Sequence, residues 1–147
     1  MQQTDTKGRT IPDQEDRPNK LTKAAKATVD AILGEDDPYN YIRAKAIVQI
    51  GKTELVKKNK EKVEELMLEA QTQITNVFGE EHPLTAKYNH FLIEAYNMQD
   101  STPARTAKII AICQKNLEIT SKHYGEGSLF SVRVLYTMYT AYLHEET

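Results

Sequence analysis

The side chains of this sequence best suited to metal binding or nucleophilic catalysis are four histidines and one cysteine. No histidine is spaced i, i+4 from another on one predicted helix, and none has a cysteine in metal-ligand spacing. The four are His82, His90, His123 and His144. Cys113 has no activating base or cation beside it in the sequence, so we expect a buried, inert thiol. The sequence therefore predicts no metal, no cofactor, no catalytic residue and no enzymatic activity.

Two runs of charged residues have structural explanations. The acidic run at residues 35–37 lacks the alternating oxygen ligands and central glycine of a calcium loop, and it suits the start of a helix, where carboxylates compensate the helix dipole. The lysines between residues 57 and 62 straddle a predicted turn, which indicates a solvated surface rather than a phosphate site. A single cysteine cannot form an internal disulfide, so packing must hold the fold together.

Length and composition exclude several classes of protein. A chain of 147 residues corresponds to one domain or to a segment of a longer repeat array. With a net charge of -2, there is no basic excess to bind nucleic acid. No run of 18 apolar residues occurs, and residues 1–19 hold only two sizeable apolar side chains, so neither a membrane span nor a signal peptide is predicted. We expect a cytoplasmic protein without nucleic-acid or membrane partners.

A polar tail precedes a helical domain. Residues 1–19 combine charged side chains with two prolines, which is typical of an extended or disordered tail. Beyond residue 20 no sustained apolar and polar alternation favours a strand, so the expected fold is all-α. The predicted helices are 20–33, 38–57, 60–78, 83–98, 103–124 and 129–144. The residues expected to cap helix starts are Asp37, Asn59, Thr102 and Ser128, two of them followed by proline at the first helical position.

An apolar residue followed by Gly-Glu recurs at a fixed spacing. The three glycines, Gly34, Gly79 and Gly125, lie 45 and 46 residues apart, each where a predicted helix must end. The helices that follow Gly79 and Gly125 share an apolar stripe, and the helix that follows Gly34 matches it loosely; this repetition predicts a solenoid of helix pairs. In the middle copy the stripe is Leu84, Tyr88, Phe91, Leu92, Ala95 and Tyr96, and in the last copy Phe130, Val134, Thr137, Met138, Ala141 and Tyr142. The tyrosines expected in the core are Tyr88, Tyr96, Tyr124 and Tyr142.

The most specific motif of the chain surrounds His82-Pro83. It consists of Gly79, His82, Pro83, Ala86, Leu92 and Tyr96, followed later by Leu117-Glu118-Ile119 before Tyr124-Gly125. Over residues 20–147 the chain resembles the tetratricopeptide repeat (TPR) superfamily, in the long-repeat form found in kinesin light chains. The period also fits HEAT-type helix pairs, but the Gly-Glu-x-His-Pro signature favours the TPR. Gly51 and Asn116 depart from the family pattern, which has tyrosine and alanine at these positions.

The resemblance implies antiparallel helix pairs wound into a right-handed superhelix. The units would be a half repeat at 20–33, repeats at 38–78 and 83–124, and a half repeat at 129–145, so both terminal helices lack a partner helix. Besides its core stripe, the last helix carries further apolar residues. A helix that is apolar on several sides is normally buried on more than one of them. Another subunit, a continuation of the chain or self-association would each cover it. The candidate partner-facing surface is Val132, Leu135, Tyr139 and Leu143.

The resemblance also implies a concave groove lined by the first helix of each pair. Carried over residue by residue, its positions are Lys45, Gln49, Lys52, Lys87, His90, Glu94, Asn97, Arg133 and Tyr136. With four cations and one carboxylate, this surface favours an extended peptide that carries acidic groups. The alternative is an ordinary solvated surface. The asparagines that commonly clamp a peptide backbone in such grooves are replaced in the middle copy by His90 and Phe91.

The expected function is a non-catalytic scaffold or adaptor that mediates protein–protein interactions in a larger assembly. The family suggests a cytoskeletal, motor-linked or ciliary assembly, with other protein subunits and an acidic or extended peptide as partners. Two alternatives stay open: the helical regulatory region of a larger enzyme such as a SET/MYND methyltransferase, and a stand-alone peptide-binding adaptor. The latter predicts a stable monomer.

Overall fold

The computed structural model describes residues 16–33 and 41–146 and shows six α-helices, with no strand in these ranges. The helices are α1 (Asp16–Leu33), α2 (Tyr41–Val56), α3 (Lys60–Phe78), α4 (Pro83–Asn97), α5 (Pro103–Tyr124) and α6 (Leu129–Glu146). The all-α prediction is confirmed. Helix α1 begins four residues before its predicted start. The predicted tail up to residue 15, Gly34, the acidic run and the Asp37-Pro38 cap lie outside the described residues.

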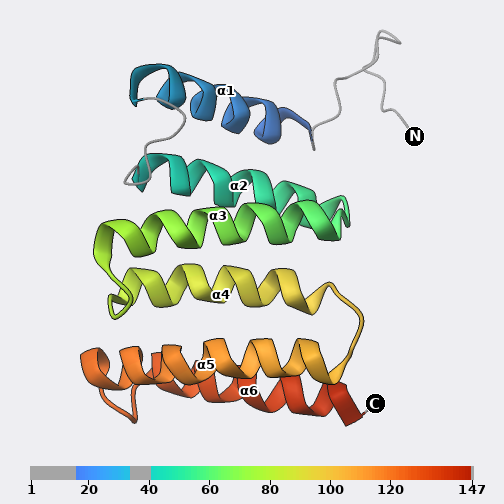
Figure 1. Ribbon diagram of the computed structural model, residues 1–147, viewed down its shortest axis with the longest axis vertical. Coiled ribbons are helices and arrows are strands. Elements are labelled where there is room, and N and C mark those ends of the chain that lie inside the picture. The colour runs from blue at the N-terminus through green and yellow to red at the C-terminus, as the bar shows by residue number, and fades with distance from the viewer. Residues whose placement is uncertain (1–15, 34–40, 147) are drawn as a thin grey trace, which may run out of the picture.

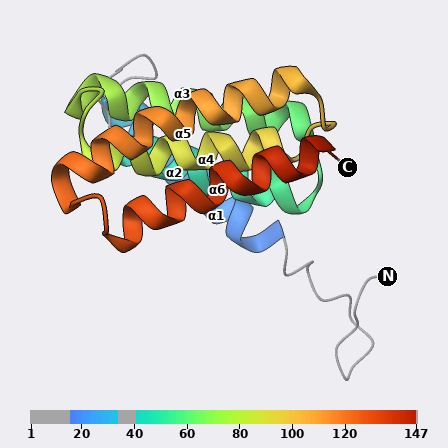
Figure 2. The ribbon, with the colours of Figure 1, turned by 90° about the horizontal axis from the view of Figure 1, so that it is seen from below.

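The helices are stacked in chain order along the long axis of the molecule (Figure 1). Each described helix packs mainly against the helix before it and the helix after it. Helix α1 forms one end of the stack, and α5 and α6 together form the other, as the view from below shows (Figure 2). None of the described helices combines the length and the apolar content that a membrane crossing requires.

The turns after α3 and α5 have the same geometry. Gly79 has φ +86° and Gly125 has φ +93°, in the left-handed region that favours glycine. The N–H of each glycine donates to the carbonyl four residues earlier. A hydroxyl six residues later donates back to the glycine carbonyl, from Thr85 at 2.6 Å and from Ser131 at 3.1 Å. The Gly-Glu spacing in the sequence thus corresponds to two turns with one set of hydrogen bonds.

Side-chain caps fix the starts of three helices. His82 Nδ1 accepts from a backbone N–H of α4 at 3.0 Å, and Thr102 Oγ1 accepts from one of α5 at 3.1 Å. Ser128 Oγ accepts from a backbone N–H of α6 at 3.2 Å. The predicted caps at Thr102 and Ser128 are therefore confirmed. The predicted cap at Asn59 is wrong, because the Asn59 amide donates instead to Glu54 Oε2 at 3.4 Å and makes no cap bond.

The apolar core extends from α2 to α6. Tyr88 and Tyr96 are buried in it as predicted, and burial raises the pKa of Tyr88 to about 12. The core prediction is wrong for Tyr124 and Tyr142, which are 48% and 51% exposed. Both belong to the end of the stack, where α6 packs mainly against α5 and no further described helix covers it. The largest fully buried apolar side chains are Ile47, Met67, Ile74, Ile93, Ile109, Val63 and Cys113.

Both departures from the family pattern have local structural reasons. A Cβ atom at Gly51 would come within 2.9 Å of Met67 Cε, so Met67 occupies the space of the missing side chain. Asn116 is buried, and its Oδ1 accepts from Asn89 Nδ2 at 3.0 Å. Met67 thus fills the space beside Gly51, and Asn116 makes a polar contact between α4 and α5.

Helix α1 is attached to α2 through a carboxylate. Asp30 Oδ1 accepts from Arg43 Nε at 2.6 Å, and Asp30 Oδ2 accepts from Lys26 Nζ at 2.8 Å. The Arg43 side chain is only 1% exposed. The hydrogen bond from Lys26, together with that from Arg43, lowers the pKa of Asp30 below its usual value of 3.8. A charged Asp30 therefore compensates the buried guanidinium.

Candidate functional site

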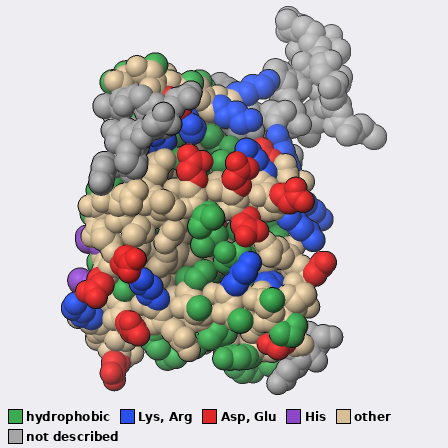
Figure 3. All heavy atoms as spheres, viewed as in Figure 1, with side chains coloured by type: hydrophobic (Ala, Val, Ile, Leu, Met, Phe, Trp, Pro, Cys, Tyr) green, Lys and Arg blue, Asp and Glu red, His purple; other side chains and the backbone are tan. Residues whose placement is uncertain are grey.

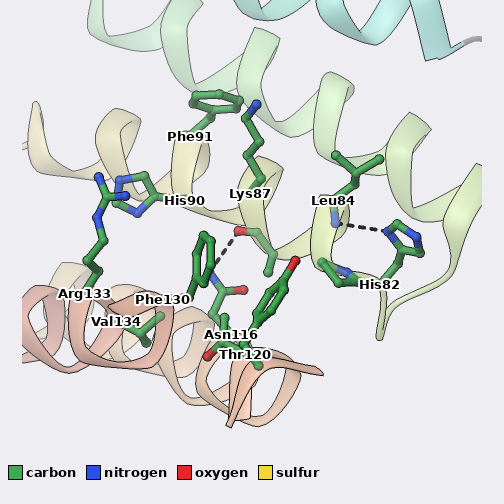
Figure 4. A pocket seen from close by; sticks show the side chains of 13 residues that line it. His82, Leu84, Lys87, His90, Phe91, Asn116, Thr120, Phe130, Arg133 and Val134 are labelled. Carbon is green, nitrogen blue, oxygen red and sulfur yellow. Dashed lines mark hydrogen bonds between the residues drawn. The ribbon is translucent and has the colours of Figure 1, made fainter. Parts of the chain in front are cut away.

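A pocket of about 640 Å³ lies between α4 and α6, with α5 at its base (Figure 4). We call it the α4–α6 pocket. This volume falls in the range of about 300–1,000 Å³ that is usual for ligand sites. Its lining residues are His82, Pro83, Leu84, Ala86, Lys87, His90, Phe91, Asn116, Thr120, Tyr124, Phe130, Arg133 and Val134.

The walls of the α4–α6 pocket are largely apolar. Helix α4 contributes Leu84 and Phe91, and α6 contributes Phe130 and Val134. The rings of Tyr124 and Phe130 stack with their centroids 4.4 Å apart, while Phe130 remains 50% exposed. A half-exposed aromatic wall of this kind can receive an apolar side chain from a ligand.

The rim of the pocket carries cations. Lys87 projects from α4, and Arg133 extends from α6 toward His90 (Figure 4). Within the described ranges neither Lys87 nor Arg133 makes an ion pair, whereas His90 Nε2 lies 3.9 Å from Glu94 Oε1. Both cations are exposed and so remain available to an anionic group.

The polar base of the pocket is already hydrogen-bonded. Asn116 Nδ2 donates to the Ala86 carbonyl at 3.0 Å, and its Oδ1 accepts from Asn89. Thr120 Oγ1 and Ser131 Oγ lie 3.0 Å apart. Because these polar groups already have partners in the protein, a charged ligand would be bound by the cations of the rim, Lys87 and Arg133.

The structure brings three of the predicted groove residues together at this pocket: Lys87, His90 and Arg133. Lys52 lies beside it, with Nζ 4.8 Å from the centroid of the Phe91 ring. Lys45 Nζ instead lies 4.5 Å from the Tyr41 ring centroid, away from the pocket lining. The remaining predicted groove residues do not line the pocket; they are Gln49, Glu94, Asn97 and Tyr136.

Sequence reasoning missed the apolar part of the pocket. Leu84, Phe91, Phe130 and Val134 were expected in the core stripes. Leu84, Phe91 and Val134 do pack against the core, but they are only partly buried, and Phe130 is 50% exposed. All four line the α4–α6 pocket. The stripe spacing identified these positions as apolar. The spacing could not show that α4 and α6, which are separated in the chain by α5, leave an open space between them.

A second apolar surface lies on the outer side of α6. The exposed fractions are 51% for Val132, 49% for Leu135, 58% for Tyr139 and 42% for Leu143. Hydrophobic side chains gather at the end of the molecule that α5 and α6 form (Figure 3). Their exposure agrees with a partner-facing surface, and that role stays a prediction.

Cys113, His82 and His123 are each buried or hydrogen-bonded as part of the fold. Cys113 is fully buried, and burial raises the pKa of its thiol to about 11. His82 caps α4, and His123 Nε2 lies 3.0 Å from the carbonyl oxygen of Glu81. Among the residues that the structure describes, no three His, Cys, Asp or Glu side chains are grouped so that they could hold a metal ion.

Comparisons of the chain with protein-family models, curated proteins and solved structures give no match. The likeness to the TPR superfamily therefore stays an interpretation of the sequence motif, and the function must be inferred from the geometry of the site.

Proposed function

We propose that this chain is a non-catalytic, TPR-like helical scaffold that holds an acidic segment of a partner protein in the α4–α6 pocket. The observation that carries the proposal is the combination of a half-exposed aromatic wall with two cations, Lys87 and Arg133, that have no ion-pair partner among the described residues. Such a protein would act as an adaptor within a larger assembly.

The pocket suits a peptide in which an apolar side chain neighbours carboxylates. The planar guanidinium of Arg133 can bind one carboxylate through two parallel hydrogen bonds. Lys87 lies on the opposite wall and supplies a point charge for a second carboxylate. Between them, Phe91 and Phe130 offer contact area to a phenylalanine or leucine of the ligand. The pocket thus selects for an apolar anchor with acidic neighbours.

Synthetic peptides of about ten residues test this proposal, each with a central phenylalanine flanked by Glu, by Gln or by Lys. Fluorescence anisotropy should show that the Glu peptide binds best, the Gln peptide more weakly and the Lys peptide not at all. Affinity for the Glu peptide should fall as salt is added, because the rim charges are exposed to solvent. Equal binding of the Glu and Gln peptides would contradict the proposal.

Two double variants test whether the rim cations bind the peptide. Lys87→Glu with Arg133→Glu should abolish binding of the Glu peptide. Lys60→Glu with Lys62→Glu makes the same change in net charge on exposed residues of α3 outside the pocket and should leave binding intact. If both double variants lose binding equally, overall charge rather than the pocket accounts for the affinity.

A further inference from the structure

His82 holds the first turn of α4 through a side chain that can change its charge. Its Nδ1 accepts a hydrogen bond from the Leu84 N–H at 3.0 Å (Figure 4). A ring nitrogen accepts a hydrogen bond only while it carries no proton, so this bond requires the neutral imidazole. Histidine is the side chain that ordinarily changes its charge between about pH 5 and pH 8. The cap of α4 therefore depends on pH.

The equivalent turn of the next copy has a cap that does not titrate in this range. His82 and Ser128 each follow the glycine of their turn by three residues. Ser128 Oγ accepts from the Ser131 N–H at 3.2 Å, and a hydroxyl oxygen accepts at neutral and at mildly acidic pH alike. Thr102 caps α5 through a hydroxyl as well. Among the side-chain caps of the described helices, a proton can remove only that of α4.

The carboxylates of the same turn already have partners. Glu80 Oε2 accepts from Lys115 Nζ at 2.7 Å, and Glu81 Oε2 accepts from Lys122 Nζ at 3.0 Å. The hydrogen bond from Lys122, together with its charge, lowers the pKa of Glu81 below its usual value of 4.5. Glu81 is thus charged and paired at about pH 5. A protonated His82 finds no unpaired carboxylate in its own turn.

Cations line the pocket side of His82. Lys87 of α4 and Arg133 of α6 line the α4–α6 pocket together with it. The helix dipole adds a partial positive charge at the start of α4, where the ring lies. A proton on His82 therefore adds positive charge to a region that is already positive, in the same step that breaks the cap.

The other neighbours of His82 do not compensate its charge. From α3 the uncharged ring of Phe78 lies with its centroid 4.7 Å from that of His82, and Tyr124 of α5, which lines the pocket, adds a second uncharged ring. His123 Nε2, also of α5, lies 3.0 Å from the Glu81 carbonyl oxygen. A carbonyl only accepts, so Nε2 is the donor, and a protonated His123 keeps this bond. The two histidines of this region thus respond to a proton in opposite ways.

The cap also holds part of the pocket wall. His82, Pro83 and Leu84 all line the α4–α6 pocket, and the bonded N–H is that of Leu84. Loss of the cap leaves an N–H group at the start of α4 without its partner and loosens the turn that carries Leu84. The wall of the pocket therefore depends on the neutral form of His82.

We propose that His82 regulates the α4–α6 pocket by pH. The neutral ring holds the pocket wall at about pH 7.5, and protonation at about pH 5.5 releases the first turn of α4 and weakens the binding of an acidic segment. The inference rests on the proposed function for its ligand, whereas the release of the cap itself requires no ligand. The adaptor would thus hold its partner at neutral pH and release it where the pH is lower.

Thermal melting tests the cap without a ligand. His82→Ser gives α4 the type of cap that the chain has at the equivalent turn, and this cap does not depend on pH. Circular dichroism compares the full-length variant with the wild type at about pH 7.5 and about pH 5.5. On acidification the melting temperature of the wild type should fall by about 2–4 °C more than that of His82→Ser. Equal falls overturn the proposal.

Nuclear magnetic resonance observes the cap directly. In the wild type the Leu84 amide signal should shift over the same pH range in which the His82 ring titrates, and in His82→Ser it should stay in place. His123→Gln is the matched control: it removes a histidine that contacts the same turn without capping α4, and it should keep the wild-type shift of Leu84. A Leu84 amide that does not respond when His82 titrates overturns the proposal.

Anisotropy titrations with the Glu peptide connect the cap to the pocket. The affinity of His82→Ser relative to the wild type should rise about threefold to tenfold between about pH 7.5 and about pH 5.5, because only the wild type loses its cap. His90 is present in both proteins, so its charge cancels from this ratio. A ratio that does not change while the peptide binds overturns the regulation of the pocket and leaves the proposed function standing.

Failure of the proposed function has a different signature. If neither protein binds the peptide at about pH 7.5, the proposed function fails and the regulation of the pocket fails with it. The melting and resonance measurements still decide whether the cap responds to pH. Should His82→Ser lose helix content, His82→Asn replaces it in all three measurements with the same results expected, because asparagine is also a favoured capping residue.

Discussion

Asn89 Nδ2 donates a hydrogen bond to Asn116 Oδ1 at 3.0 Å, beneath the α4–α6 pocket. Asn89 Oδ1 accepts in turn from Gln71 Nε2 at 3.0 Å, and Asn116 Nδ2 donates to the Ala86 carbonyl (Figure 4). One chain of amide hydrogen bonds therefore connects α3, α4 and α5. In a buried setting each amide depends on its neighbours, because an unpaired polar group there costs its full desolvation energy.

Replacing Asn116 by leucine should lower the free energy of unfolding by about 1–3 kcal/mol, because the Ala86 carbonyl and the Asn89 amide lose their partner. Urea denaturation followed by circular dichroism measures the change. Gln114→Leu, at an exposed position two residues earlier on α5, is the matched control and should change stability by less than about 0.5 kcal/mol. Equal stabilities of the two variants would show that the amide chain contributes nothing.

Lys58 lies in the left-handed region, with φ +58°, at the end of α2. The N–H of Lys58 donates to the Leu55 carbonyl and that of Asn59 to the Glu54 carbonyl, which are the two bonds of a Schellman motif. A left-handed lysine costs about 1–2 kcal/mol relative to the right-handed region, and glycine avoids most of this strain. Lys58→Gly should therefore raise the unfolding free energy by about 0.5–1 kcal/mol in urea denaturation.

The matched control for Lys58 makes the same change inside a helix. Lys62 is exposed in the first turns of α3, where glycine is less favourable than other residues by about 1 kcal/mol. Lys62→Gly should therefore destabilise the protein while Lys58→Gly stabilises it. A loss of stability in both variants would mean that the backbone conformation of Lys58 carries no strain.

Local signals in the sequence predicted most of the fold. Gly79, Gly125 and the cap at Thr102 act through backbone geometry and hydrogen bonds within a few residues, so the helix boundaries could be read from them. The left-handed Lys58 carried no such signal, because glycine or asparagine usually marks that position. Turn geometry was predictable only where the favoured residue was present.

The candidate site was less predictable, because it depends on which helices cover a given side chain. Lys87, His90 and Arg133 were chosen by analogy and do meet at one pocket. Phe130 was assigned to the core because it belongs to an apolar stripe, yet it is half exposed. Periodicity identifies the apolar side of a helix, whereas coverage of that side is a tertiary property.

The contact between Asp30 and Arg43 should control the attachment of α1. Asp30→Asn removes the carboxylate charge that lies 2.6 Å from Nε of the buried Arg43, and removal of one partner from a buried ion pair costs about 3 kcal/mol. Urea denaturation measures the loss. Asp100→Asn removes a carboxylate that is 94% exposed and 3.8 Å from Lys60, and it should have almost no effect.

Acid should weaken the same contact. The folded-state pKa of Asp30 lies below its usual value of 3.8, so the stability that its charge contributes is fully present above pH 3.8. That contribution is lost as the pH falls further, through the folded-state pKa. Wild-type protein should therefore lose stability below pH 3.8 more steeply than Asp30→Asn, as measured by urea denaturation along a pH series. Parallel profiles would exclude Asp30 as the titrating group.

Phe130 offers a way to separate ligand binding from folding. Its ring is 50% exposed and stacks on Tyr124, so Phe130→Ala should cost only about 1–2 kcal/mol of stability. The same change removes the aromatic wall of the α4–α6 pocket and should weaken binding of the Glu peptide about tenfold or more, as loss of a central aromatic contact commonly does.

Leu129→Ala is the control, because Leu129 is 70% exposed and does not line the pocket. Anisotropy titrations on both variants, beside their urea curves, would show binding lost only at Phe130. A Phe130→Ala protein that binds as well as the wild type would place the ligand elsewhere on the surface.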